Sequence, residues 1–155
     1  KELSEQLQFN FYHVLREKHY KHIKPCIIIE RLLTDEQGEI PSDYKIHCFN
    51  GKPTFVELDS DRFTDHKLTT YDTQWKKLNL QRRFPMADEV PPPKSLNEML
   101  ALAEKLAEPF NYVRVDFYEN NASVYFGELT FSPGGGFARF NPPEMDRVWG
   151  DLLTL

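Results

Sequence analysis

The sequence predicts an α+β protein, built mainly from an antiparallel sheet with helices packed on it. Three observations carry this prediction. Alternating apolar and polar residues flank Asn50-Gly51, a second alternating stretch runs through residues 113–130, and a helical apolar stripe follows Ser95. Asn-Gly between two alternating runs is a strong β-hairpin signal. Consecutive strands with separate helices are typical of the α+β class.

The composition predicts one folded domain spanning residues 1–155. Hydrophobic residues make up 40% of the 155 residues and aromatic residues 14%, which is enough for a core. The net charge of −5 argues against nucleic-acid binding. There is no apolar run of membrane-span length and no signal-peptide pattern, so we expect a cytoplasmic protein. Because the chain opens with Lys1 and helix-like sequence, we expect it to be a fragment of a longer protein.

The first 33 residues are predicted to form a helix and a strand. Apolar residues at helical spacing over Leu3–Tyr20 predict an amphipathic helix, which Pro25 ends. The continuous apolar run CIIIERLL, residues 26–33, predicts a strand buried on both faces. Cys26 and Cys48 both fall in apolar runs and are expected to be buried, reduced thiols.

The remaining elements follow from turn and cap signals. Ser95 begins a helix because Glu98, three residues later, completes a capping box. The predicted elements after residue 42 are the strands Asp43–Phe49, Thr54–Asp59 and Lys67–Tyr71, the helix from Ser95, the hairpin 113–130 and a terminal helix over Pro142–Leu153.

Four polar residues gather at one end of the last hairpin. Arg114 and Asp116 are two apart on one strand, and Glu128 and Thr130 are two apart on the next. Each pair therefore points to one face. A two-residue loop starting at Asn120 would put Asp116 and Glu128 on opposite faces, whereas a three-residue loop makes them diagonal neighbours. The functional interpretation requires the odd-length loop, in which Arg114 faces Glu128.

Two neighbouring carboxylates repel each other unless a positive group lies between them. A divalent cation suits Asp116 and Glu128, because Mg²⁺ binds through one or two carboxylates together with phosphate oxygens. Arg114 beside them could clamp a phosphoryl group. One alternative is an exposed charge ladder in which Arg114 pairs with Glu128. Another is a glycosidase pair of carboxylates, for which the adjacent arginine is less natural.

These residues resemble a known family. RVDFY…VYFGELTFSPGGG resembles the C-terminal signature of ATP-grasp ligases, which has R-x-D, then E-x-N on the next strand, then P-G. The stretches KPCIIIERLL, DYKIHCFNGKP and ELDSDRFTDHK narrow the resemblance to the TupA-like (teichuronopeptide-type) ATP-grasp proteins of bacterial surface-polysaccharide biosynthesis. The resemblance runs from about Tyr20 to Leu155 and implies the ATP-grasp-like C-terminal lobe.

The resemblance implies ATP and Mg²⁺ as cofactors and assigns ligands for them. Asp116 and Glu128 would hold Mg²⁺, with Thr130 standing where most ATP-grasp enzymes carry Asn. Arg114 would contact the transferred phosphate, and Lys45 would meet a phosphate as well. Asp43, Lys45 and His47 alternate onto one face, which fits this role but also fits a solvated face.

The resemblance further places the adenine and the substrates. Residues 29–32 would form a linker strand beside the adenine, with Glu30 near the amino group or the ribose. The alternative is a core strand with one surface Glu. A basic cluster at residues 62–67 would steer an anionic substrate, unless it is an ordinary surface loop. The residues assigned to adenine are Ile29, Glu30, Arg31 and Leu32, and those assigned to substrate are Arg62, His66, Lys67, Gly134, Gly135 and Gly136.

The residues and the resemblance together leave three functions open. The leading one is an ATP- and Mg²⁺-dependent carboxylate–amine ligase acting through an acyl-phosphate, or the metal- and nucleotide-binding lobe of one. Its partners would be a small-molecule carboxylate, an amine or sugar-linked acceptor, and an N-terminal lobe supplying a lysine and a Gly-rich loop. The second is a non-catalytic ATP-grasp-derived binding domain. The third is a carbohydrate-active enzyme, a glycosyltransferase or hydrolase, with an aromatic-lined cleft and no need for ATP.

Overall fold

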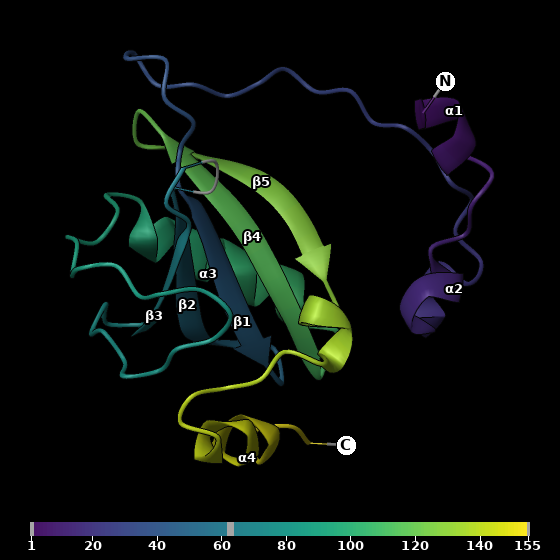
Figure 1. Cartoon of the computed structure of the whole chain (residues 1–155). Coiled ribbons are helices and arrows are strands. Elements are labelled where there is room, and N and C mark those ends of the chain that lie inside the picture. The colour runs from purple at the N-terminus through teal and green to yellow at the C-terminus, as the bar shows by residue number, and fades with distance from the viewer. Residues whose placement is uncertain (1, 62–63, 155) are drawn as a thin grey trace.

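The computed structural model describes residues 2–61 and 64–154 of the chain. Within these residues the centre of the fold is a five-stranded antiparallel sheet in the order β3-β2-β1-β4-β5 (Figure 1). The predicted α+β class is confirmed. The strands are β1 (Asp43–Phe49), β2 (Lys52–Ser60), β3 (Lys67–Asp72), β4 (Tyr112–Asn120) and β5 (Ser123–Thr130).

The first hairpin forms where the sequence predicts it. Asn50 and Gly51 both have positive φ, 50° and 76°, as a two-residue turn between twisted strands requires. Phe49 therefore pairs with Lys52, and the ladder of β1 and β2 continues to Asp43 and Asp59. Local turn chemistry is sufficient here to set the register.

The second hairpin has the shorter of the two turns considered, a two-residue turn. Asn121 and Ala122 form the turn, with φ of 52° and 59°, and Asn120 pairs with Ser123. The odd-length loop that the functional interpretation requires is therefore not formed. The turn alone would separate Asp116 from Glu128, so another feature of β5 must bring them together.

One face of the sheet is apolar and is covered by α3 (Leu96–Ala107). On the sheet-facing side of α3, Met99, Ala103 and Ala107 are fully buried. They pack against the apolar side chains of the strands, which are Ile46, Cys48, Val56, Leu58, Tyr71, Val113, Val115 and Phe117.

The start of α3 lies at the predicted residue, but the capping box is not formed. Ser95 makes no side-chain cap bond. Its Oγ donates to the Ala122 carbonyl at 3.0 Å, and its N–H donates to Glu119 Oε2 at 2.8 Å. The helix end is therefore fixed to the β4–β5 turn rather than to its own first turn.

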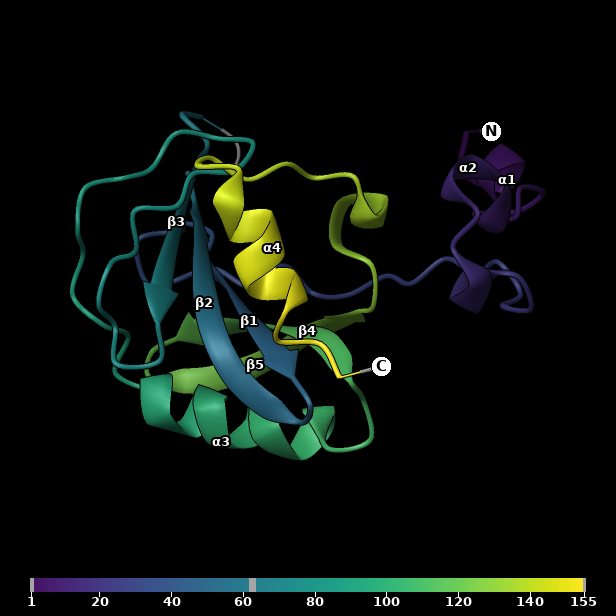
Figure 2. The same cartoon turned by 90° about the horizontal axis from the view of Figure 1, so that it is seen from below.

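The opposite face is partly covered by α4 (Glu144–Gly150), as Figure 2 shows with α3 and α4 on opposite sides of the sheet. Trp149 of α4 stacks on Phe55 with ring centroids 4.3 Å apart. Together with Phe49 and Leu80 it forms a second small core. A terminal helix within Pro142–Leu153 was predicted, and the structure confirms it.

The predicted helix over Leu3–Tyr20 is wrong. Three short pieces replace it, α1 (Glu2–Gln6), α2 (Tyr12–Leu15) and η1 (Lys18–Tyr20). Arg16 has a left-handed conformation, with φ of 61°, which ends α2 after one turn. This part of the chain lies beside β5, away from the centre of the sheet (Figure 1).

The predicted buried strand over residues 26–33 is also wrong. The structure assigns no strand there, and Ile29 is 90% exposed. Cys26 is exposed as well, whereas Cys48 is buried as predicted, and both thiols are free. An apolar run becomes a buried strand only where another strand pairs with it, and the described residues provide none. No helix in the described ranges is both long and apolar enough to cross a membrane.

Candidate functional site

The face of the sheet opposite α3 carries buried charges. Asp43, Lys45 and His47 alternate along β1 and so share this face. The register sets Lys45 between Glu57 of β2 and Asp116 of β4. All five side chains are buried. Burying charges is costly unless they are paired, so their partners define the site.

Lys45 is the centre of a carboxylate cluster. Its Nζ contacts Asp43 Oδ2, lies 3.1 Å from Asp116 Oδ2 and lies 3.7 Å from Asp59 Oδ2. Burial acts to lower the pKa of Lys45, but Asp116 and Asp43 outweigh it and raise that pKa above its ordinary value. Lys45 therefore remains charged and holds the carboxylates together.

Arg114 is the second cation and connects β4 to β5. Its Nε donates to Asp116 Oδ1 at 2.7 Å, and its Nη2 donates to Asp116 Oδ2, also at 2.7 Å. The same Nη2 donates to Glu128 Oε1 at 3.0 Å and to Thr130 Oγ1 at 2.9 Å. One guanidinium nitrogen thus lies where oxygens of Asp116, Glu128 and Thr130 converge.

A β-bulge in β5 produces this convergence. Between the pairs Val115–Leu129 and Phe117–Phe126, two residues of β5 oppose the single residue Asp116. The two are Gly127 and Glu128, and the extra residue moves Glu128 to the face of Asp116. A Cβ on Gly127 would lie 3.1 Å from both the Asp116 carbonyl oxygen and a Tyr118 ring carbon. The isolated glycine within a strand pattern was the signal for this bulge.

The predicted metal ligands fit a hard cation in kind but not in their present geometry. Asp116, Glu128 and Thr130 offer only oxygen, as Mg²⁺ prefers, but Mg²⁺–O distances are about 2.0–2.1 Å. Arg114 Nη2 holds the shared position, at 2.7–3.0 Å from the three oxygens. Among the described residues, no group of three or more His, Cys, Asp or Glu side chains is arranged for a metal. A cation could enter only if the Arg114 side chain moved.

The charge-ladder alternative describes only half of this arrangement. The Glu128 side chain is 64% exposed and pairs with Arg114, as that alternative expects. Asp116 is 2% exposed and is held by Arg114 and Lys45 together. The two carboxylates therefore have different environments, one buried and constrained, the other open to solvent.

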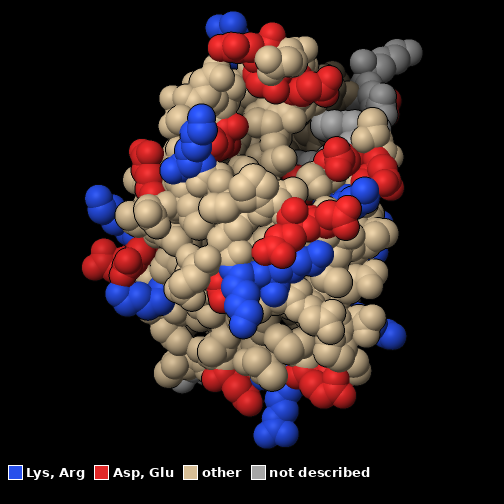
Figure 3. Space-filling model, turned by 90° about the vertical axis from the view of Figure 1, so that its left-hand side faces the viewer, with Lys and Arg blue, Asp and Glu red and all other residues tan. Residues whose placement is uncertain are grey.

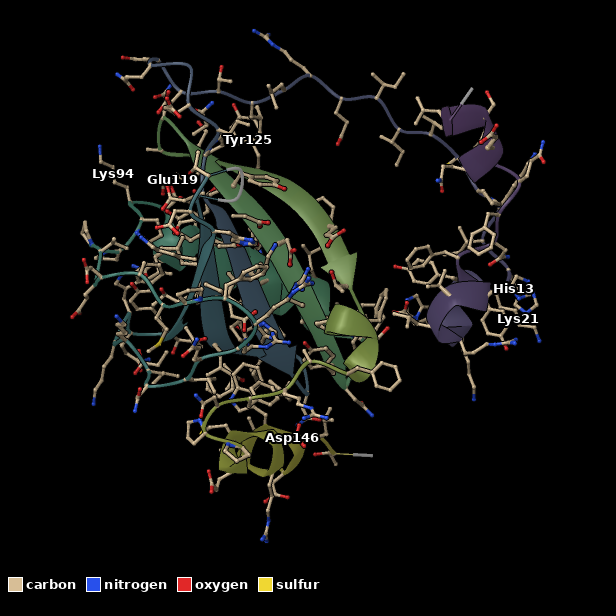
Figure 4. The ribbon with its side chains drawn as sticks, viewed as in Figure 1. His13, Lys21, Lys94, Glu119, Tyr125 and Asp146 are labelled. Atoms are coloured by element: carbon tan, nitrogen blue, oxygen red, sulfur yellow. The ribbon has the colours of Figure 1, made fainter. Side chains whose placement is uncertain are left out.

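A cleft of about 750 Å³ adjoins these charges. Asp43, Lys45, Asp116 and Glu128 line one part of it. The rest is formed by Tyr118, Tyr125, Phe126 and Gly127 of the last hairpin and by Glu30, Arg31, Leu32, Leu33, Ile40 and Pro41. In Figure 4, Tyr125 lies at the end of β5 that is farther from α4, and Asp146 labels α4.

The structure thus brings most of the predicted adenine-binding segment to the predicted metal residues. Glu30, Arg31 and Leu32 share the cleft with Lys45, although not as a strand. Ile29 is outside the lining and faces solvent.

Of the predicted substrate residues at 62–67, the two that the structure describes, His66 and Lys67, are paired with acidic side chains. His66 Nε2 bonds to Asp59 Oδ1, and its ring lies on Phe84 with centroids 3.7 Å apart. Lys67 pairs with Asp65 at 3.0 Å. Arg62 lies outside the described residues. His66 is connected through Asp59 to Lys45, whereas Lys67 is not part of that network.

The glycine-rich loop is η2 (Pro133–Gly136). Gly134, Gly135 and Gly136 all have positive φ, from 60° to 78°. Leu15 lies directly on Gly135, where a Cβ would be 2.4 Å from Leu15 Cδ1. In the described part of the chain, none of these glycines lines the cleft.

Sequence reasoning missed a second buried network beside Lys45. Glu57 accepts bonds from Arg82 Nη1 at 2.8 and 3.0 Å and contacts His47 Nε2 at 3.0 Å. The other His47 nitrogen lies 2.8 Å from the Tyr112 hydroxyl. Burial acts to raise the pKa of Glu57, but His47 and Arg82 together lower it to about 2. The alternation of Glu57 and Asp59 opposite β1 was the available signal.

The antiparallel sheet with α3 packed on one face is consistent with an ATP-grasp-like α+β fold. The model of the family described as TupA-like ATPgrasp matches residues 1–154, so the chain belongs to the TupA-like ATP-grasp family. No curated protein and no solved structure matches the chain. The family resemblance predicted from the sequence is confirmed, and proteins of this kind generally bind ATP and Mg²⁺.

Proposed function

We propose that the chain acts as an ATP- and Mg²⁺-dependent carboxylate–amine ligase, or as its metal- and nucleotide-binding lobe, in bacterial surface-polysaccharide biosynthesis. The observation that carries the proposal is the cleft. It joins the segment Glu30–Leu33 to Lys45, Asp116 and Glu128, residues that are far apart in the sequence.

The cleft offers complementary surfaces to the parts of a nucleotide. Tyr118, Tyr125 and Phe126 provide aromatic surface for a base, and aromatic stacking on a base is worth about 1–3 kcal/mol. Lys45 and Arg31 provide positive charge for phosphates. The segment Glu30–Leu33 would supply backbone groups to the adenine edge.

In this proposal the chain's own residues position charge for phosphoryl transfer. Bound Mg²⁺ would neutralise charge developing on the transferred phosphoryl group. Asp116, Glu128 and Thr130 would hold the ion, while Lys45 keeps the Asp116 carboxylate in place. Arg114, displaced from between the carboxylates, would contact the transferred phosphate or the acyl-phosphate.

The remaining assignments concern the acceptor side. An amine would attack the carbonyl carbon of the acyl-phosphate, forming the amide bond and releasing inorganic phosphate. The loop of residues 134–136 would let the acceptor approach the backbone. Acceptor binding at His66 would affect Lys45 through Asp59, because Asp59 contacts both side chains. The assignment of Arg62 and Lys67 to acceptor binding rests on the sequence prediction alone.

The experiment that tests the proposal is acyl-phosphate trapping. The chain is incubated with Mg·ATP, pools of amino acids and sugar acids, and hydroxylamine in place of the unknown amine. We expect ADP and hydroxamate to form together with one pool, and Glu128→Gln to abolish both. The matched variant Glu89→Gln, an exposed loop glutamate, should behave as the wild type. ADP release without hydroxamate would contradict a ligase.

A non-catalytic binding domain is the second candidate. Its supporting observation is that Arg114 occupies the position where the metal ligands converge, with both Asp116 oxygens bonded. In that case Mg·ATP or ATP alone would bind, and no carboxylate would stimulate ADP release. The aromatic lining of the cleft also suits a sugar ring, and binding of sugars without ATP would instead favour a carbohydrate-active protein.

A further inference from the structure

The N-terminal segment, defined here as residues 3–24, exposes many large apolar side chains. Nineteen large hydrophobic residues are exposed among the described residues, and seven of them fall in this segment. Isolated exposed apolar residues are normal, but a concentration of them marks an interaction surface. The seven are Leu3, Leu7, Phe9, Phe11, Val14, Leu15 and Ile23, with exposures of 40–62%.

The same segment is basic in an otherwise acidic protein. Arg16, Lys18, Lys21 and Lys24 fall within nine residues that contain one acidic residue, Glu17. The whole chain has a net charge of −5, so the positive charge is local. All four basic side chains are exposed.

The apolar and basic residues belong to one folded unit. Phe11 and Tyr20 pack edge to face at 5.2 Å, and Asn10 Nδ2 donates to the Lys21 carbonyl at 3.1 Å. These contacts fold residues 10–12 back onto residues 20–21. The exposed Phe11 ring therefore lies close to residues 20–21.

One side of this unit is attached to the protein, and the other side is open. Leu15 covers Gly135, Ser132 Oγ donates to Glu17, and His19 lies 5.6 Å from Phe131 between ring centroids. His13 and Lys21 point away from the sheet on the outer side of the segment (Figure 4). The opposite side of the molecule has Lys and Arg interspersed with Asp and Glu (Figure 3). The N-terminal segment thus combines exposed apolar side chains with a basic run.

We propose that the N-terminal segment docks on the surface of an anionic lipid bilayer. Its chemistry matches that surface, because apolar side chains enter the headgroup boundary while Lys and Arg meet anionic headgroups. The segment lies on the bilayer and does not cross it, since no described helix is long and apolar enough to span. A second copy is the less suitable occupant, because two identical basic segments repel each other. The inference does not depend on the proposed ligase function.

The test is co-sedimentation of the chain with vesicles of two compositions. One set contains phosphatidylcholine alone, and the other contains phosphatidylcholine and phosphatidylglycerol in equal parts. We expect binding to the anionic vesicles only, weakened by added salt. A basic residue near such a surface contributes roughly fivefold in affinity, so the triple variant Lys18→Gln, Lys21→Gln, Lys24→Gln should bind at least about tenfold more weakly.

Two further variants separate charge from apolar contact. The triple variant Lys76→Gln, Lys94→Gln, Lys105→Gln makes the same change in net charge at exposed lysines outside the segment, and it should bind as the wild type. Phe9→Ser with Ile23→Ser should lose binding while the charge stays constant. Circular dichroism verifies that each variant is folded.

Several outcomes would overturn the proposal. Equal binding to both vesicle compositions, or to neither, would remove the role of anionic lipid. Equal losses in the two lysine variants would show a general charge effect. The protein could also fail to bind vesicles and instead form a dimer, detected by light scattering, that Phe9→Ser with Ile23→Ser disrupts. That result would assign the segment to contact with a second copy.

Discussion

The two faces of the sheet are made by alternate residues of the same strands, yet they are built on different chemistry. On the α3 face, Ile46, Val56 and Val115 are fully buried among other apolar groups. On the opposite face, the neighbouring residues Lys45, Glu57 and Asp116 are almost equally buried but charged. Burial is thus nearly the same on both faces, and only the polarity differs.

This difference indicates what each face is for. Apolar burial contributes about 25 cal/mol per Å², so the α3 face stabilises the fold directly. Buried ion pairs contribute little compared with apolar residues of the same volume, because desolvation offsets their attraction. A set of charges beside a cleft is therefore explained better by ligand chemistry than by stability. Substitutions on the charged face test this contrast, from the largest expected change in stability to the smallest.

Asp116→Asn should have the largest effect on stability. It leaves Arg114 and Lys45 buried without their shared carboxylate, which costs about 3–5 kcal/mol in comparable cases. The variant should also lose Mg·ATP binding. Urea unfolding compares it with Asp146→Asn, an exposed control on α4. A loss below about 1 kcal/mol would show that the charged face is not a constrained network.

Glu57 predicts a specific loss of stability in acid. Its pKa is lowered from 4.5 to about 2 in the folded state, so its contribution is complete above pH 4.5 and is lost as the pH falls toward 2. The contribution is about 3 kcal/mol at the ordinary conversion of pKa to free energy. Urea unfolding at about pH 5 and about pH 3 measures how much the free energy of unfolding falls in acid. This fall should be smaller for Glu57→Gln than for the wild type. Equal differences would contradict the role of His47 and Arg82.

Gly127→Ala tests the bulge. The new methyl group would lie 3.1 Å from the Asp116 carbonyl oxygen and from the Tyr118 ring, so the backbone of β4 must shift. Overpacking of this kind costs about 1–3 kcal/mol. Gly150→Ala is the matched control, because nothing lies within 4 Å of its added methyl group. If Gly127→Ala were as stable as the control and bound nucleotide normally, the bulge would not be needed to place Glu128.

Glu128→Gln should have the smallest effect on stability. Its side chain is 64% exposed, and exposed ion pairs contribute about 0–1 kcal/mol. Thermal unfolding should barely change, while Mg·ATP binding is lost. A variant that unfolds much more easily would place Glu128 among the structural charges with Asp116.

Local signals predicted the sheet well, and long-range features were predicted poorly. Asn50-Gly51 predicted the first hairpin correctly because its turn geometry is a property of those two residues. The run at residues 26–33 was predicted as a buried strand, but apolar sequence alone does not identify a partner. The cleft could not be derived from spacing, because residues 30–33 and the last hairpin, which line it together, are far apart in the sequence.

The candidate site shows the same division. Strand alternation predicted that Asp43, Lys45 and His47 share a face, and the structure confirms that placement. The approach of Glu128 to Asp116 was predicted through the wrong feature, the turn, whereas the bulge at Gly127 produces it. Arg82 was missed because its contact with Glu57 joins a proline-rich connection to β2, a pairing that no periodic pattern encodes.

Calorimetric titration of Mg·ATP into the wild type and Glu128→Gln, with EDTA as the metal control, tests most directly whether the charged face binds a metal and a nucleotide. We predict binding by the wild type, loss of that binding with EDTA, and loss in Glu128→Gln at unchanged thermal stability. Equal binding by both proteins in EDTA would contradict this prediction. The charges on the open face of the sheet would then not form a metal–nucleotide site.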